Sequence, residues 1–181
     1  MAVSTRMVVA AVISGFVLFA LTKPDTAEVE GARSKAVPER IDIPVLQMKA
    51  PLIKLGLTGG GEVELPPYEK PKIAGWYEGS AVPGDKGAAV IIGHVDTKSA
   101  PAVFYRLREL KKGAVVKVVR SDDKTISYKV DSIEQIPKEK FPAEKVYLGE
   151  GLRLVTCGGQ FDWNAHEYKD NVIVYASRLD T

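Results

Sequence analysis

Cysteine and histidine are almost absent from this chain. The sequence has one cysteine, Cys157, and two histidines, His94 and His166, among 181 residues. A single cysteine excludes an intramolecular disulfide, and these three side chains are too few for a typical zinc site built from cysteine and histidine. We therefore expect neither a bound metal nor another cofactor.

Long blocks of one charge are also lacking. The 25 Lys and Arg side chains are scattered and nearly balanced by 23 Asp and Glu, which gives a net charge of +2. No aromatic residues are interleaved with a basic cluster, so a nucleic-acid partner is not expected. The sequence does contain 45% hydrophobic and 27% charged residues. This composition is typical of one globular domain with an appendage.

An apolar segment lies near the N-terminus. Residues 7–21 carry no charge, over a length that is short for a transmembrane helix and suits the core of a signal peptide. No cleavage site of small residues follows, so we predict an uncleaved signal anchor over residues 1–22, with a removed signal peptide as the alternative. Arg6 precedes the run and Asp25 and Glu28 follow it, which places the N-terminus in the cytoplasm. The remainder is then an extracellular domain on a single-pass anchor in the cell membrane.

A polar segment separates this anchor from the rest of the chain. Residues 23–39 include Pro24 and Pro38 and show no apolar periodicity. Such a composition predicts a flexible stalk. The folded domain is expected to occupy residues 40–181.

The signals in this domain are those of β-strands. Short apolar or alternating runs bounded by Gly, Pro and Asp predict strands at 41–45, 50–57, 73–77, 88–95, 114–120, 125–136, 152–157 and 171–177. Phe104, Leu107 and Leu110 lie on one face of a short helix predicted at 103–110. The segment 137–151 is expected to be irregular or briefly helical, and the segment 158–170 to be a loop. The pattern favours a closed barrel or a sandwich over a doubly wound sheet.

Two of the predicted strands end in reactive side chains. One apolar strand ends at His94 and another ends at Cys157, which Gly158 and Gly159 follow. Cys157 is either a small buried hydrophobe or a nucleophile, and His94 either a core histidine or its base. If the strands are neighbours, thiol and imidazole form the minimum centre for acyl transfer. Asp96 and Asp162 are candidates to orient His94 or to cap turns, whereas His166 is expected at the surface.

Several segments together resemble one family, the class F sortases. The resemblance rests on Gly93-His94-Val95-Asp96, on residues 102–107, on residues 154–159 with Phe161-Asp162, and on Tyr168-Lys169-Asp170-Asn171-Val172. It covers roughly residues 40–179. Each piece alone is weak, but their order and spacing are specific.

The resemblance implies an all-β fold, a closed eight-stranded sortase β-barrel with one or two short helices, and a cysteine transpeptidase. Cys157 would attack the Thr–Gly bond of an LPXTG-type sorting signal and form a thioester. His94 would protonate the leaving amine and later deprotonate the incoming one. Thr156 and Gly158, the neighbours of Cys157, would take part in substrate binding.

The same resemblance implies the partners. The acyl donors would be secreted proteins that carry a sorting signal, and the acceptor would be the amine of a peptidoglycan precursor, with water as a side reaction. The enzyme would act as a monomer on the outer face of Gram-positive cells, where the predicted anchor would hold it.

One position departs from the family pattern. Sortases carry an arginine downstream of the cysteine, and in the class F pattern it is expected where Lys169 stands. Lysine keeps the positive charge but lacks the planar fork of donors. We expect Lys169 to act as the cation of the site. Arg106 and Arg108 in the segment after His94, and Arg178 near the end of the last strand, are the other candidates.

Two further classes of protein stay open. Another exported cell-wall cysteine enzyme is one, but an L,D-transpeptidase would show Ser-His-Gly before its cysteine, where this chain has Val155-Thr156. A papain-like amidase has its cysteine before its histidine, the reverse of the order here. The other class is a non-catalytic exported β-domain, which predicts that Cys157 is buried and far from His94.

Overall fold

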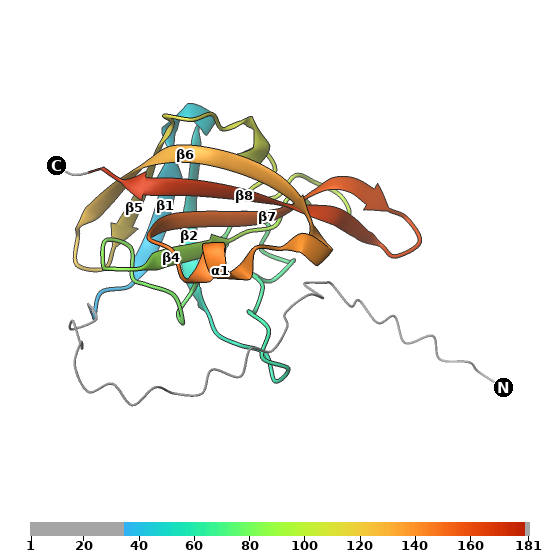
Figure 1. Ribbon diagram of the computed structural model, residues 1–181, viewed down its shortest axis with the longest axis horizontal. Coiled ribbons are helices and arrows are strands. Elements are labelled where there is room, and N and C mark those ends of the chain that lie inside the picture. Colours follow the sequence, from blue (N-terminus) through green and yellow to red (C-terminus); the bar gives the residue numbers. More distant parts are fainter. Residues whose placement is uncertain (1–34, 180–181) are drawn as a thin grey trace.

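The computed structural model describes residues 35–179 as a β-barrel (Figure 1). Its strands are β1 (Pro38–Ile43), β2 (Met48–Leu55), β3 (Ala74–Tyr77), β4 (Ala88–Ile92), β5 (Val115–Arg120), β6 (Thr125–Pro137), β7 (Gly151–Asp162) and β8 (Glu167–Arg178). They close in the order β1-β2-β3-β4-β7-β8-β6-β5. The expected closed, eight-stranded barrel with a few short helices is therefore confirmed.

The predicted anchor, residues 1–22, lies outside the described residues, as does most of the predicted stalk, residues 23–39. β1 begins at Pro38, so the last two residues of that stalk belong to the strand. Within residues 35–179, no helix has the length and apolarity needed to cross a bilayer.

The barrel interior explains the alternating strands. Ile41 and Ile43 on β1, and Val116 and Val118 on β5, are fully buried in one core cluster, and polar or exposed residues separate each pair. Because successive side chains of a strand point to opposite faces, one face of these strands fills the barrel and the other faces outward.

β4 does not alternate, because all five of its residues are buried. Ala89 and Ile91 belong to the barrel interior, whereas Val90 and Ile92 belong to a second cluster outside the wall. The short helix α1 (Ala143–Tyr147) supplies Val146 to that second cluster. A strand covered on both faces has no polar face, which accounts for the unbroken apolar run in its sequence.

Two neighbouring pairs in the wall are parallel, β2 with β3 and β4 with β7. Parallel neighbours need a long crossover connection, and the one from β4 to β7 includes β5, β6 and α1. As a result, the C-terminal ends of β4 and β7 lie at the same end of the barrel. This arrangement decides where the reactive side chains meet.

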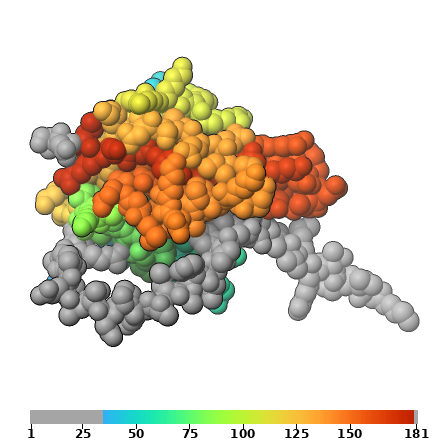
Figure 2. Space-filling model, in the orientation of Figure 1, coloured from blue at the N-terminus to red at the C-terminus, as the bar shows by residue number. Residues whose placement is uncertain are grey.

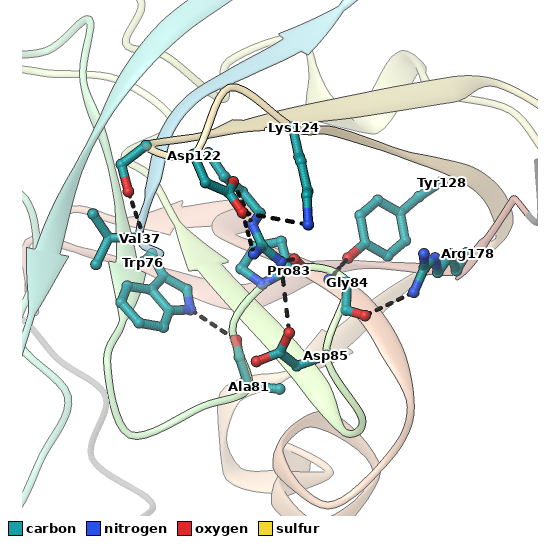
Figure 3. A network of polar contacts seen from close by, with 12 residues as sticks. Val37, Trp76, Ala81, Pro83, Gly84, Asp85, Asp122, Lys124, Tyr128 and Arg178 are labelled. Atoms are coloured by element: carbon teal, nitrogen blue, oxygen red, sulfur yellow. Dashed lines mark hydrogen bonds and ion pairs between the residues drawn. The ribbon is translucent and has the colours of Figure 1, made fainter. Parts of the chain in front are cut away.

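A polar network holds the loop before β4, at the barrel end opposite to the C-terminal ends of β4 and β7 (Figure 3). The buried Arg120 donates from Nη1 to the Pro83 carbonyl oxygen at 2.9 Å, and its Nη2 lies 2.8 Å from Asp122 Oδ2. Tyr128 Oη accepts from the Gly84 backbone N–H at 2.8 Å, which draws the loop onto β6. The loop is thereby held by charged and neutral hydrogen bonds together.

Only part of the helix predicted at 103–110 forms. The segment consists of turns and one 3-10 helix, η2 (Leu107–Glu109). The backbone N–H of Leu107 donates to Phe104 O, and that of Leu110 donates to Leu107 O, so the bonds join residues three apart. This spacing places Phe104, Leu107 and Leu110 on one buried side, as a helix would, because residues three apart align in 3-10 geometry.

The loop predicted at 158–170 is wrong except for the turn at 163–166, because β7 and β8 continue into a hairpin that projects from the barrel (Figures 1 and 2). The register shifts between Gly158 and Phe161, and the ladder then resumes with Phe161 opposite Tyr168. Gly159, with φ +75°, is located in this irregularity. The two glycines therefore form a bulge within a strand and do not end it.

Candidate active site

The sheet register brings the two reactive side chains to matching positions. The last paired residues of β4 and β7 are Ile92 and Val155, and the Gly93 backbone N–H still donates to Val155 O at 3.1 Å. His94 and Cys157 each lie two residues beyond that last pair. The structure thus makes the two strands neighbours, as an acyl-transfer centre requires.

Cys157 opens into a cavity of about 300 Å³. The cavity is lined by Val95, Asp96, Phe104, Tyr105, Arg108, Gln135, Thr156, Cys157, Gly158, Gly159, Phe161, Tyr168 and Val172. Its volume is at the lower end of the range for ligand sites in proteins. Because Cys157 is partly exposed and lines this cavity, its sulfur is not the fully enclosed packing group of the alternative interpretation.

The surroundings favour the protonated thiol. Burial is the main cause that raises the pKa of Cys157 above its ordinary value. Lys138 opposes this shift, whereas the charges of Asp96 and Glu167 add to it. At neutral pH the sulfur therefore rests as a thiol and needs a base when it reacts.

His94 is buried, with 7% of its surface exposed, and the loop between β2 and β3 covers it. Its Nε2 lies 2.6 Å from the Pro66 carbonyl oxygen, and the ring of Tyr68 stacks on the imidazole with the ring centroids 4.1 Å apart. A carbonyl oxygen can only accept, so Nε2 carries a proton. Nδ1 is then the nitrogen that remains for proton transfer.

Tyr68 stacks on the histidine, and the charge of the cysteine acts on its phenol. Burial raises the pKa of Tyr68, and the charges of Cys157 and Asp96 add to that shift. The phenol therefore lies within electrostatic range of Cys157 while its ring stacks on His94. Neither Pro66 nor Tyr68 was identified from the sequence, where the Leu65-Pro66-Pro67 run indicates only a loop.

The two aspartates have partners other than the imidazole. Tyr168 Oη donates a hydrogen bond to Asp96 Oδ2. Burial is the first cause that raises the pKa of Tyr168 to about 12, and this bond is the second. Asp162 Oδ1 accepts from the backbone N–H groups of Asn164 and Ala165. Asp162 therefore caps the hairpin turn, as the simpler interpretation expects.

Lys169 lies on β8 outside the cavity lining. Its side chain is 52% exposed, and its Nζ is 3.7 Å from Asp162 Oδ2. Its catalytic role stays a prediction. His166 is exposed in the hairpin turn with φ +55°, in agreement with its expected place at the surface.

Thr156 and Gly158, the residues predicted to bind substrate, both line the cavity. A Cβ on Gly158 would lie 2.6 Å from Val172 Cγ2, so a larger residue would displace its neighbour on β8. Thr156 is buried, and its Oγ1 has no hydrogen-bond partner among the described residues. Within residues 35–179, no group of three or more His, Cys, Asp or Glu side chains is arranged to hold a metal ion.

Comparisons with known proteins agree on one fold. Group B Streptococcus pilus island 1 sortase C2 has a TM-score of 0.59 and 22% identity over 78% of this chain and 73% of that one. Sortase C-1 from Actinomyces oris has a TM-score of 0.61 and 23% identity over 79% and 72%. Sortase C-1 from Streptococcus pneumoniae has a TM-score of 0.59 and 23% identity over 79% and 67%.

A comparison with curated proteins found no match. The solved structures share the barrel, and at these identities they show the fold alone. A model of the sortase domain family matches residues 41–179, which include all strands from Ile41 of β1 to Arg178 of β8. On this match, the chain belongs to the sortase family.

Proposed function

We propose that this sortase is an extracellular class F cysteine transpeptidase that cleaves LPXTG-type sorting signals between Thr and Gly. The observation that carries the proposal is the register of β4 and β7, which places His94 and Cys157 at matching positions at one end of the barrel. The class assignment rests on the sequence segments around these residues and on Tyr168-Lys169-Asp170. The membrane location rests on the apolar segment within residues 1–22.

The reaction has two halves. In the first, the Cys157 thiol loses its proton to His94 Nδ1, and the sulfur attacks the Thr carbonyl carbon of the sorting signal. The C–N bond to Gly breaks, His94 returns the proton to the leaving amine, and a thioester remains on Cys157. In the second half, an amine of a peptidoglycan precursor attacks the thioester carbonyl carbon as His94 takes its proton. The new C–N bond forms, the C–S bond breaks, and His94 returns the proton to the Cys157 sulfur. Water in place of the amine gives hydrolysis.

The proposal predicts that a sorting-signal peptide acylates Cys157. The purified full chain is incubated with an LPXTG-type peptide, and mass spectrometry follows the adduct on Cys157 and the released Gly-containing fragment. We expect both products with the wild-type protein and neither with Cys157→Ala, because the chain has no second cysteine to replace the nucleophile. Cleavage that persists in Cys157→Ala would show that the mechanism is wrong. A peptide with Thr and Gly exchanged serves as the control for sequence-independent reaction.

A further inference from the structure

Among residues 35–179, one cationic side chain lines the cavity at Cys157, that of Arg108. Lys138, whose charge acts on Cys157, and Lys169, the cation expected from the sequence, do not line it. Lys138 Nζ is 2.9 Å from Glu167 Oε2, and Lys169 Nζ is close to Asp162. Arg108 follows the histidine segment in sequence, on η2, and it approaches the cavity from a different element than β8.

Arg108 has no acceptor for its N–H groups within the described part of the chain. The neighbouring carboxylate, Glu109, already accepts from Arg106, from Nε at 2.9 Å and from Nη2 at 2.7 Å. Arg108 instead lies over the ring of Tyr105, with its Cζ 5.4 Å from the ring centroid. This contact is with the face of the ring and uses no hydrogen bond, so the N–H donors of the guanidinium stay available.

The segment that carries Arg108 is held firmly against the site. Phe104 and Leu107 are 1% exposed in the barrel core. The Phe104 backbone N–H donates to the His94 carbonyl oxygen at 3.0 Å, so this segment is tied to the histidine itself. The backbone that carries Arg108 is therefore fixed, and its exposed side chain brings unused donors to the same cavity as the thiol.

We propose that Arg108 is a substrate-binding residue that donates hydrogen bonds to carbonyl oxygens of the acyl-donor peptide in the Cys157 cavity. This inference rests on the proposed function. It assigns to η2 the cationic contact that the sequence pattern places at Lys169. An extended peptide presents backbone carbonyl oxygens along its length, and a planar fork of donors suits them better than a single ammonium group.

The test compares acylation rates of full-length variants with one sorting-signal peptide. Arg108→Ala is expected to lower kcat/KM for acylation about 10- to 100-fold, the range for a lost hydrogen bond to a charged group. Arg108→Lys should recover only part of that loss, because the charge remains without the fork. The loss in Lys169→Ala should be smaller than in Arg108→Ala. Arg40→Ala, an exposed arginine on β1, should acylate at the wild-type rate.

A second measurement separates peptide binding from the chemistry of the thiol. Iodoacetamide is small and neutral, and Cys157 is the only cysteine it can label. Alkylation should proceed equally fast in wild type and in Arg108→Ala. An alkylation rate that falls as far as the acylation rate would overturn the inference, because the variant would then have changed the thiol or the fold.

The other outcomes are also decisive. Wild-type acylation by Arg108→Ala, or a larger loss in Lys169→Ala, shows that Arg108 does not bind the peptide and leaves the proposed function intact. If wild-type protein forms no adduct with any sorting-signal peptide, the proposed function itself is wrong and this inference is wrong with it.

Discussion

At the scale of single residues, the reactivity of Cys157 depends on charges that partly cancel. Burial disfavours the thiolate, and Glu167 adds to that effect, whereas Lys138 favours it. Lys138 and Glu167 form an ion pair of 2.9 Å, and only 11% of the Lys138 side chain is exposed. A poorly solvated lysine is a stronger influence on a nearby sulfur than an exposed one, because water screens it less.

The Lys138–Glu167 ion pair predicts that two substitutions shift the pKa of Cys157 in opposite directions. Glu167→Gln removes a negative charge that raises the pKa of Cys157, so this pKa should fall and alkylation at neutral pH should become faster. Lys138→Met removes the charge that lowers it, so the pKa should rise and alkylation should slow. The measurement is the rate of reaction with iodoacetamide as a function of pH.

The matched control for this pair is Glu139→Gln, which removes a carboxylate next to Lys138 that does not act on Cys157. Its pH profile should equal that of the wild type. Shifts of the same sign in Glu167→Gln and Lys138→Met would contradict the electrostatic account.

At the scale of elements, the loop between β2 and β3 positions the histidine. Pro66 O accepts from His94 Nε2, and Tyr68 stacks on the ring. We therefore expect neutral His94 to be the Nε2–H tautomer, which ¹⁵N chemical shifts of the labelled ring report directly. Tyr68→Ala should lower the acylation rate about 2- to 10-fold, because a stacked aromatic pair contributes about 0.5–1.5 kcal/mol.

The control for this loop is Tyr68→Phe, which keeps the ring and should retain both the tautomer and the rate, because the stack does not need the phenol oxygen. A resting Nδ1–H tautomer in the wild type would show that Pro66 does not hold the imidazole in solution.

The sequence alone predicted some of the elements and site residues and missed others. Local patterns predicted most strands and the His94–Cys157 pair, because alternation and chain order are local properties. The hairpin beyond Gly159 was missed, since two successive glycines suggest a turn, and only the cross-strand contact of Phe161 with Tyr168 shows that pairing resumes. Tyr68 was not assigned to the site, and Arg108 was only one of three alternatives to Lys169, because each reaches the site through tertiary packing that no local pattern encodes.

At the scale of the whole molecule, the site depends on how the barrel closes at β4 and β7. Gly151 begins β7 opposite Ala88, and this first pair sets the register that carries Cys157 to the position beside His94. Gly151 has φ +92°, and a Cβ added there would lie 2.4 Å from the Ala176 carbonyl oxygen on β8. Backbone atoms cannot move aside as a flexible side chain can, so the glycine is needed for both conformation and space.

Gly113 offers a matched control, because its φ is +91° and a Cβ there would meet nothing within 4 Å. Gly113→Ala should lower the free energy of unfolding by about 1–2 kcal/mol, the cost of a left-handed backbone at a residue with a Cβ. Gly151→Ala should lower it by that amount and about 2 kcal/mol more, because overpacking against backbone adds to the strain.

Chemical denaturation of the two full-length variants measures the difference. Equal destabilisation would mean that β7 and β8 can separate at no cost, and the register would then not depend on Gly151. If the register does depend on it, the fraction of Gly151→Ala that stays folded should also acylate Cys157 more slowly than Gly113→Ala does.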